Sequence, residues 1–175
     1  MIVSKEEWKK KMDNLQIWRK NRKNKLNTNI NKNPYKEWVD RVKLGKTVLD
    51  IGCGAKSIEN VLPKDIKYVG IDPFPIVENV VKMSIEECTF DDRSFDTVFV
   101  LAVLDGVYDL EKSLEQINRI ANTNIVIITG LDIEVDKCHT QYIKLEDILN
   151  GLKDFEIKYK EMIHTKTWLF DFWRK

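Results

Sequence analysis

Short apolar runs recur along the chain from residue 47 onward, separated by polar turns and amphipathic stretches. Each run is continuously apolar and does not alternate with polar residues, which is typical of parallel strands buried on both faces. The runs cover residues 47–51, 67–71, 97–104 and 124–129. They predict the inner strands of a parallel sheet.

Amphipathic stripes with helical spacing lie between and after these runs. One spans residues 110–121, with Asp109 as its expected N-cap, and another spans residues 145–152. Residues 155–162 and 167–173 predict two final strands. This order indicates an α/β fold with a doubly wound, mostly parallel sheet of seven-stranded type, flanked by helices.

One connection is too short for an ordinary crossover. Only about ten residues separate Asp72, at the end of the second strand, from a further strand near residues 80–83. A crossover that contains a helix needs a dozen or more residues. We therefore expect either an irregular loop here or a rudimentary edge strand.

The first 46 residues predict two helices. Ser4 and Glu7 have the spacing of a capping box. An Asn-rich loop over residues 24–33 separates this first helix from a second, which starts at Pro34 and ends at Gly45. The apolar stripe of the first helix consists of Trp8, Met12, Leu15 and Trp18. This stripe is too apolar for a solvated helix, so we expect it to pack on the rest of the protein.

Charge divides the chain at the same place. Residues 1–46 hold 14 Lys and Arg against 5 Asp and Glu, although the net charge of the whole chain is only +1. We therefore expect residues 1–46 to form a basic helical cap on a main domain of residues 47–175. The basic segment either lies on the acidic body or binds a polyanion such as RNA or DNA.

Composition excludes several other classes of protein. With 43% hydrophobic and 33% charged residues, the chain can bury a sizeable core. Its longest apolar run, residues 98–104, is far short of the roughly 20 residues that span a bilayer, and we expect no membrane segment and no signal peptide. Three cysteines without a CxxC pair and only two histidines predict no disulfide and no metal site, and favour a cytoplasmic protein.

A glycine turn carries the strongest functional signal. The predicted strand that ends at Ile51 runs directly into Gly52 and Gly54, where the backbone can approach a ligand closely. Asp72 ends the next strand, 20 residues after Gly52. A carboxylate at this place can accept hydrogen bonds from both hydroxyls of a ribose. A dinucleotide fingerprint has a third glycine or an alanine three positions after its second glycine, and this chain has Ser57 there. The Asp50 carboxylate is also a poor neighbour for the anionic pyrophosphate of a dinucleotide. A cationic nucleoside ligand is favoured.

These residues resemble the motifs of the class I S-adenosylmethionine-dependent methyltransferases. Asp50 to Gly54 reads as the D-x-G-x-G motif of that family, and Asp72 matches its ribose-binding acid. Residues 84–96 resemble the adenine segment and the approach to the fourth strand. Residues 103–107 and 139–157 match later blocks, so the likeness covers roughly residues 47–162.

The resemblance implies a methyltransferase with S-adenosylmethionine as its cofactor. The cofactor contacts that it implies are Asp50, Gly52, Cys53, Gly54, Lys56, Asp72, Pro73, Ser84, Ile85, Glu86, Leu101 and Ala102. The chain departs from the family pattern at Lys56, where a third glycine is usual, and at Ser84, where an acid is common. Lys56 either reaches the carboxylate of the cofactor or projects into solvent. Ala102 and Gly106 also replace polar residues of relatives, so an inactive relative remains an alternative.

Methyl transfer from a sulfonium needs mainly alignment and desolvation. A base is needed only if the acceptor must lose a proton, and the candidates are Asp105, His139 and Asp132. The N/D-P-P-Y/F element of DNA amino-methylating enzymes is missing after the fourth strand. We therefore expect a small-molecule acceptor, methylated at O or N beneath the N-terminal helices. The alternatives are an RNA-associated methyltransferase and an inactive S-adenosylmethionine-binding module.

Overall fold

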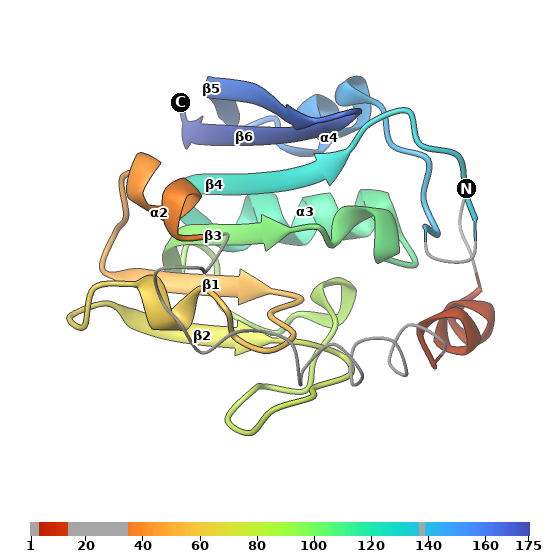
Figure 1. Cartoon of the computed structure of the whole chain (residues 1–175), viewed down its shortest axis with the longest axis horizontal. Coiled ribbons are helices and arrows are strands. Elements are labelled where there is room, and N and C mark those ends of the chain that lie inside the picture. Colours follow the sequence, from red (N-terminus) through yellow and green to blue (C-terminus); the bar gives the residue numbers. More distant parts are fainter. Residues whose placement is uncertain (1–3, 14–34, 137–138) are drawn as a thin grey trace.

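A central sheet organises the part of the chain that the computed structural model describes, which is residues 4–13, 35–136 and 139–175. Its strands are β1 (Thr47–Ile51), β2 (Lys67–Ile71), β3 (Phe95–Leu101), β4 (Ala121–Gly130), β5 (Phe155–His164) and β6 (Thr167–Arg174). They lie in the order β2-β1-β3-β4-β6-β5 (Figure 1). The first four strands in this order are parallel, and β6 inserts antiparallel between β4 and β5. The predicted doubly wound class is confirmed.

Helices cover both faces of this sheet. The helices α3 (Leu110–Ile120) and α4 (Leu145–Gly151) pack on one face, and α2 (Lys36–Arg41) lies on the other (Figure 1). Neighbouring residues of β4 point to opposite sides, so that Ile127 joins the core under α3 while Val126 joins the core under α2. The predicted capping is also correct, because the Asp109 side chain accepts a hydrogen bond from the backbone N–H of Lys112.

The crossovers on either side of β2 contain no α-helix. Residues 52–66 form turns and the short 3₁₀-helix η2 (Glu59–Val61), and residues 72–94 contain only the 3₁₀-helix η3 (Ile85–Glu87). A single parallel bridge, between Ile71 and Val81, stands where the seven-stranded pattern has its third strand. The rudimentary edge strand is thus confirmed, and the sheet formed by the described residues has six strands.

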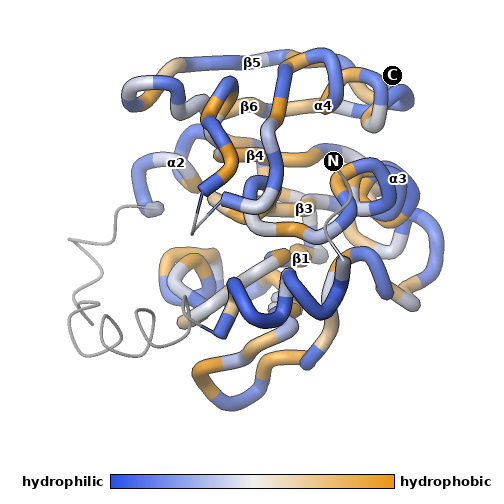
Figure 2. Tube along the Cα trace, turned by 90° about the vertical axis from the view of Figure 1, so that its right-hand side faces the viewer, coloured by the Kyte–Doolittle hydropathy of each residue, from blue (hydrophilic) through white to orange (hydrophobic). Residues whose placement is uncertain are grey.

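An N-terminal helix, described over residues 5–13, lies at the edge of the sheet where the parallel strands end. Figure 2 views the molecule from this edge, and the helix crosses in front of the sheet. Leu15, Trp18, the Asn-rich loop and Pro34 lie outside the described residues. The division at residue 46 stays a prediction. None of the helices in the described ranges is long and apolar enough to cross a membrane.

Candidate functional site

The glycine turn after β1 is tied to the acid at the end of β2. Gly52 and Gly54 have positive φ angles of 66° and 52°, which favour glycine. A Cβ at Gly52 would lie 2.5 Å from Val103 Cγ2, so no larger residue fits there. The Asp72 carboxylate accepts hydrogen bonds from the backbone N–H of Gly54 at 3.1 Å and of Phe74 at 2.8 Å. Asp72 thereby fixes the geometry of the turn.

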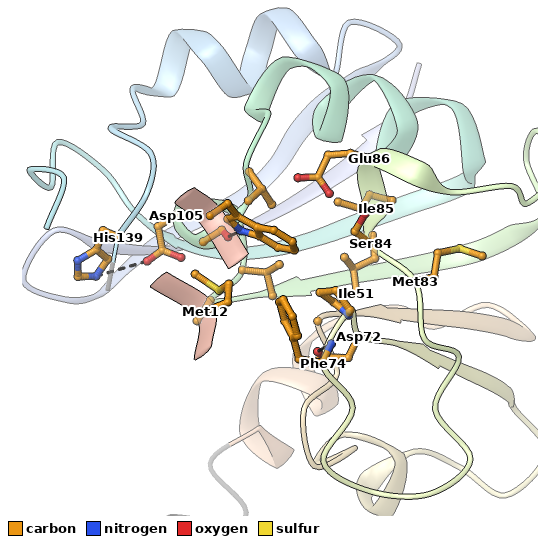
Figure 3. A pocket seen from close by; sticks show the side chains of 17 residues that line it. Met12, Ile51, Asp72, Phe74, Met83, Ser84, Ile85, Glu86, Asp105 and His139 are labelled. Carbon is orange, nitrogen blue, oxygen red and sulfur yellow. Dashed lines mark hydrogen bonds and ion pairs between the residues drawn. The ribbon is translucent and has the colours of Figure 1, made fainter. Parts of the chain in front are cut away.

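A cavity of about 290 Å³ opens beside this turn, at the carboxyl ends of β1, β2 and β3 (Figure 3). It lies where open parallel sheets bind their ligands. Many residues that the sequence predicts for the site line this cavity. They are Gly52, Asp72, Pro73, Ser84, Ile85, Glu86, Ala102, Asp105 and His139. The fold therefore brings these predicted residues together from segments that are up to 87 positions apart in the sequence.

Asp50 does not line the cavity, although the family resemblance implies a cofactor contact at this residue. Asp50 is buried in β1 beneath the glycine turn, and it accepts a hydrogen bond of 2.8 Å from the Tyr68 hydroxyl. Burial raises the pKa of the Asp50 carboxyl to about 7. Asp50 therefore ties β1 to β2 through Tyr68.

Cys53 and Gly54 also lie outside the cavity lining, although both belong to the turn. Cys53 is buried, and its burial raises the pKa of its thiol to about 12. A thiol with such a pKa is not a nucleophile at neutral pH, so Cys53 serves as a small buried residue of the turn. Gly54 donates its N–H to Asp72 instead of presenting it to the cavity.

Lys56 points away from the cavity. Its ammonium lies 2.8 Å from a carboxylate oxygen of Glu59 and 5.4 Å from the centre of the Tyr68 ring. Its φ of 55° is left-handed, so this lysine adopts the backbone conformation for which relatives use glycine. The sequence predicts that Lys56 either reaches the cofactor carboxylate or projects into solvent, whereas in the structure its ammonium lies in this local pair and its side chain is 14% exposed.

Two neighbouring residues at the end of β3 are expected cofactor contacts, but only one of them lines the cavity. Leu101 packs with the core beneath α2, on the face away from the cavity. Ala102 lines the cavity with a left-handed φ of 55°, and its N–H donates to the Ile128 carbonyl at 2.7 Å. The change of direction at Ala102 turns the chain across the floor of the cavity.

Glu86 lies opposite the glycine turn, on η3. Its carboxylate accepts a hydrogen bond of 2.9 Å from the Tyr108 N–H, and burial raises the pKa of its carboxyl. Glu86 thereby holds the loop that follows η4 (Leu104–Gly106) against the adenine segment expected from sequence. Figure 3 shows Ser84, Ile85 and Glu86 on one side of the cavity and Asp72 across from them.

Asp105 and His139 face each other at the far end of the cavity (Figure 3). The distance between Asp105 Oδ2 and His139 Nε2 is 3.6 Å. On its other side, His139 Nδ1 lies 2.8 Å from Asp136 Oδ1. Burial raises the pKa of the Asp105 carboxyl, while the neighbouring His139 lowers it. The third candidate base, Asp132, lies outside the cavity, where its carboxylate accepts from the Tyr142 hydroxyl.

The N-terminal helix closes one side of the cavity, a role that the sequence does not assign to particular residues. Trp8 and Met12 are buried and line the cavity. The indole N–H of Trp8 donates to the Gly106 carbonyl at 2.6 Å, and its ring centre lies 5.2 Å from those of Phe74 and Tyr108. Helical spacing indicates that Trp8 is packed. The spacing does not indicate which loops Trp8 packs against.

Residues 18–147 match the protein family described as a methyltransferase domain. The chain belongs to this family, and it is an S-adenosylmethionine-dependent methyltransferase of class I. A search of curated proteins found no match.

Solved structures show the same fold at low sequence identity. The [4+2]-cyclase SpnF is 12% identical, with a TM-score of 0.66 over 81% of this chain and 80% of its own. Magnesium protoporphyrin IX methyltransferase from Synechocystis, solved with bound S-adenosylmethionine, is 17% identical, with a TM-score of 0.60 over 80% and 76%. A complex of the Haloferax volcanii Trm112 methyltransferase activator with a putative methyltransferase matches at 15% identity and a TM-score of 0.61, over 81% and 88%.

S-adenosylmethionine is the cofactor of this class, and the residues around the cavity fit it. The buried Asp72 carboxylate matches ribose hydroxyls, and the apolar side chains of Ile51, Met83 and Ile85 provide surfaces for an adenine ring. No Lys or Arg stands among the described residues that line the cavity, which suits a sulfonium cation.

Proposed function

We propose that this methyltransferase acts on a small-molecule acceptor at an oxygen or nitrogen atom, beneath the N-terminal helix as a lid. The observation that carries the proposal is the position of Trp8. Its buried indole spans the cavity between Phe74 and the Gly106 carbonyl. An acceptor enclosed beneath this side chain must be small, and enclosure supplies the desolvation that methyl transfer needs.

Further contacts of the N-terminal helix support its role as a lid. Lys5 pairs with Glu87 beside the adenine segment, and the Lys11 ammonium donates to the Asp136 carbonyl at 3.3 Å. The helix therefore joins the two ends of the cavity. These two contacts are polar and exposed, and such contacts contribute little stability, so the buried Trp8 and Met12 are the main anchors of the lid.

The residues of the cavity receive the following roles in this proposal. Asp72 binds the ribose of the cofactor, and the turn at Gly52 accommodates its methionine part. Ser84, Ile85 and Glu86 surround the adenine. When bound, S-adenosylmethionine supplies an activated methyl group next to the end of β3. Asp105 and His139 then stand ready to take a proton from the acceptor.

Transfer of a labelled methyl group tests the proposal. The wild-type protein is incubated with methyl-labelled S-adenosylmethionine and either a small-metabolite extract or purified RNA, and labelled products are counted. We expect label in the small-molecule fraction, and a strong decrease in the Asp72→Ala variant. Label in RNA alone would contradict a small-molecule acceptor, and label in neither fraction would support an inactive cofactor-binding module.

One observation favours the RNA-associated alternative. A second groove of about 260 Å³ adjoins the cavity, and Lys5, Lys9 and Lys82 line it. Glu87, the partner of Lys5, also lines this groove, so the ammonium groups of Lys9 and Lys82 are the ones that can contact phosphates. RNA binding through phosphate contacts would weaken steeply as the salt concentration rises. The logarithm of the binding constant would fall with the logarithm of the salt concentration, with a slope of roughly −0.7 for each phosphate contacted on a single strand. A flat salt dependence would leave the small-molecule proposal in place.

A further inference from the structure

The end of the cavity at Asp105 and His139 presents two hydrogen-bond acceptors to the same point. The Nδ1 atom of His139 lies 2.8 Å from the Asp136 carboxylate, which has only acceptor atoms when ionised. When the imidazole is neutral, the hydrogen therefore lies on Nδ1 and the lone pair lies on Nε2. That lone pair faces Asp105 Oδ2, another acceptor, across 3.6 Å.

Asp105 differs in its partners from the other two carboxylates that line the cavity. Asp72 and Glu86 accept backbone N–H groups at 2.8–3.1 Å. The Asp105 carboxylate has a backbone hydrogen bond only within its own residue, and its side-chain neighbour is the His139 ring, at a separation too long for a hydrogen bond. A cation that enters the cavity would stabilise this half-buried carboxylate.

The geometry also distinguishes between acceptor atoms. A hydroxyl has one hydrogen and can satisfy either Asp105 Oδ2 or His139 Nε2, while the other stays unmatched. An amine or ammonium nitrogen has at least two hydrogens. Such a nitrogen can lie about 2.9 Å from both atoms at once, because they are only 3.6 Å apart.

We propose that the methyl acceptor is a primary or secondary amine that binds as an ammonium between Asp105 and His139. Asp136 is a positioning residue that holds His139 in the tautomer with Nε2 unprotonated. This inference rests on the proposed function, and it names the class of acceptor at the same site.

The chemical step balances with these residues. The ammonium gives one proton to His139 Nε2, and the freed lone pair of the nitrogen attacks the methyl carbon. The bond between that carbon and the sulfur breaks, and its electron pair stays on sulfur. The methylated nitrogen is again cationic and keeps its partner in Asp105 until release. The proton on His139 leaves to solvent after the product departs.

An assay with a chemically blocked acceptor pool tests the class of acceptor. A small-metabolite extract is divided, and one half is treated with an amine-selective acylating ester and quenched. Both halves are then incubated with the wild-type protein and methyl-labelled S-adenosylmethionine. We expect labelled product from the untreated half and its loss from the acylated half. Equal label in both halves would overturn the amine proposal alone, whereas label in neither would overturn the proposed function and this inference with it.

Variants place the effect on Asp105. We expect Asp105→Asn to lower kcat/KM for the labelled amine by about tenfold to a hundredfold, the range for a lost charged hydrogen bond. Glu134→Gln is the matched control, because Glu134 is an exposed carboxylate that does not line the cavity, and we expect it to keep wild-type kcat/KM. Equal losses in both variants would contradict an ammonium contact at Asp105.

Nitrogen NMR of the imidazoles tests Asp136 without any turnover. At about pH 8, where an ordinary imidazole is neutral, we expect His139 to show a hydrogen on Nδ1. In Asp136→Asn this preference should weaken, while His164, in the β5–β6 hairpin, serves as an internal reference in the same spectrum. A wild-type His139 with its hydrogen on Nε2 would overturn the role of Asp136.

Discussion

Asp72 accepts a hydrogen bond from the backbone N–H of Gly54, so the acid that ends β2 fixes the glycine turn that ends β1. The same carboxylate accepts the N–H of Phe74, whose ring packs against Trp8 of the N-terminal helix. One side chain thus connects the turn, the wall of the cavity and the lid. A change at Asp72 is expected to act on all three.

We expect Asp72→Ala to weaken binding of S-adenosylhomocysteine by about 1.5–3 kcal/mol, the range for a lost hydrogen bond to a charged group. Isothermal calorimetry measures this change. Asp65→Ala is a suitable control, because Asp65 is exposed and pairs with Lys46 on the surface. Unchanged affinity in Asp72→Ala would remove Asp72 from the cofactor site.

We expect Trp8→Ala to reduce turnover by about tenfold or more while cofactor affinity changes by less than about threefold. The substitution removes the packing on Phe74 and the hydrogen bond to the Gly106 carbonyl, so the lid loses its anchor. Steady-state kinetics and calorimetry measure the two effects separately. Glu6→Ala, on the exposed side of the same helix, is the control. Full activity of Trp8→Ala would show that the helix does not serve as a lid.

Lys56 offers a comparison of backbone strain. Lys56→Gly and Lys56→Ala both lose the pair with Glu59, but only glycine adopts the left-handed φ of 55° without strain. We expect the glycine variant to have a free energy of unfolding about 0.5–1 kcal/mol greater than that of the alanine variant. Urea denaturation measures the difference. A more stable alanine variant would contradict strain at this position.

The same lysine can be tested for a ligand contact. Because its ammonium pairs with Glu59 beside the Tyr68 ring, we expect Lys56→Ala to change the affinities for S-adenosylhomocysteine and 5′-methylthioadenosine equally. The second ligand lacks the amino-acid tail of the first. A selective loss of S-adenosylhomocysteine binding would show that Lys56 reaches the cofactor carboxylate after all.

The buried Asp50 predicts a pH dependence of stability. Its pKa rises from 3.8 to about 7 on folding, so between about pH 4 and pH 7 the folded state holds a proton that the unfolded state has lost. Stability therefore falls as the pH rises through this window, on the order of 2–4 kcal/mol. We expect Asp50→Asn to remove most of this fall in urea denaturation at pH 5 and pH 8. The exposed Asp91→Asn should retain it. An unchanged fall in Asp50→Asn would assign it to other groups.

The sequence predicts the strands well because buried strands consist almost entirely of apolar residues. The bounds of β1 and β2 agree with the apolar runs over residues 47–51 and 67–71. The amphipathic stripe of α3 and its cap at Asp109 agree as well. Buried strands and capped helices depend on local residue types, and local residue types are what a sequence displays.

Side-chain direction at the site is harder to predict. Asp50 and Leu101 belong to the expected segments, yet each points away from the cavity, because one residue of shift in a strand reverses the face. Asp136 contacts His139 from only three positions away, but no motif marks it. Trp8 reaches the site by tertiary packing from a distant segment, also without a motif. Such contacts require knowledge of the fold.

The place of β6 between β4 and β5 has a consequence for how the protein is made. The edge of β4 over residues 124–130 pairs with residues 167–173 of β6. Of the six strands of the sheet, β6 is the last to be synthesised. Until then a long apolar strand edge in the nascent chain stays open to other chains. Pairing of β6 therefore closes the open edge of β4 only at a late step, well after the cofactor turn has been synthesised.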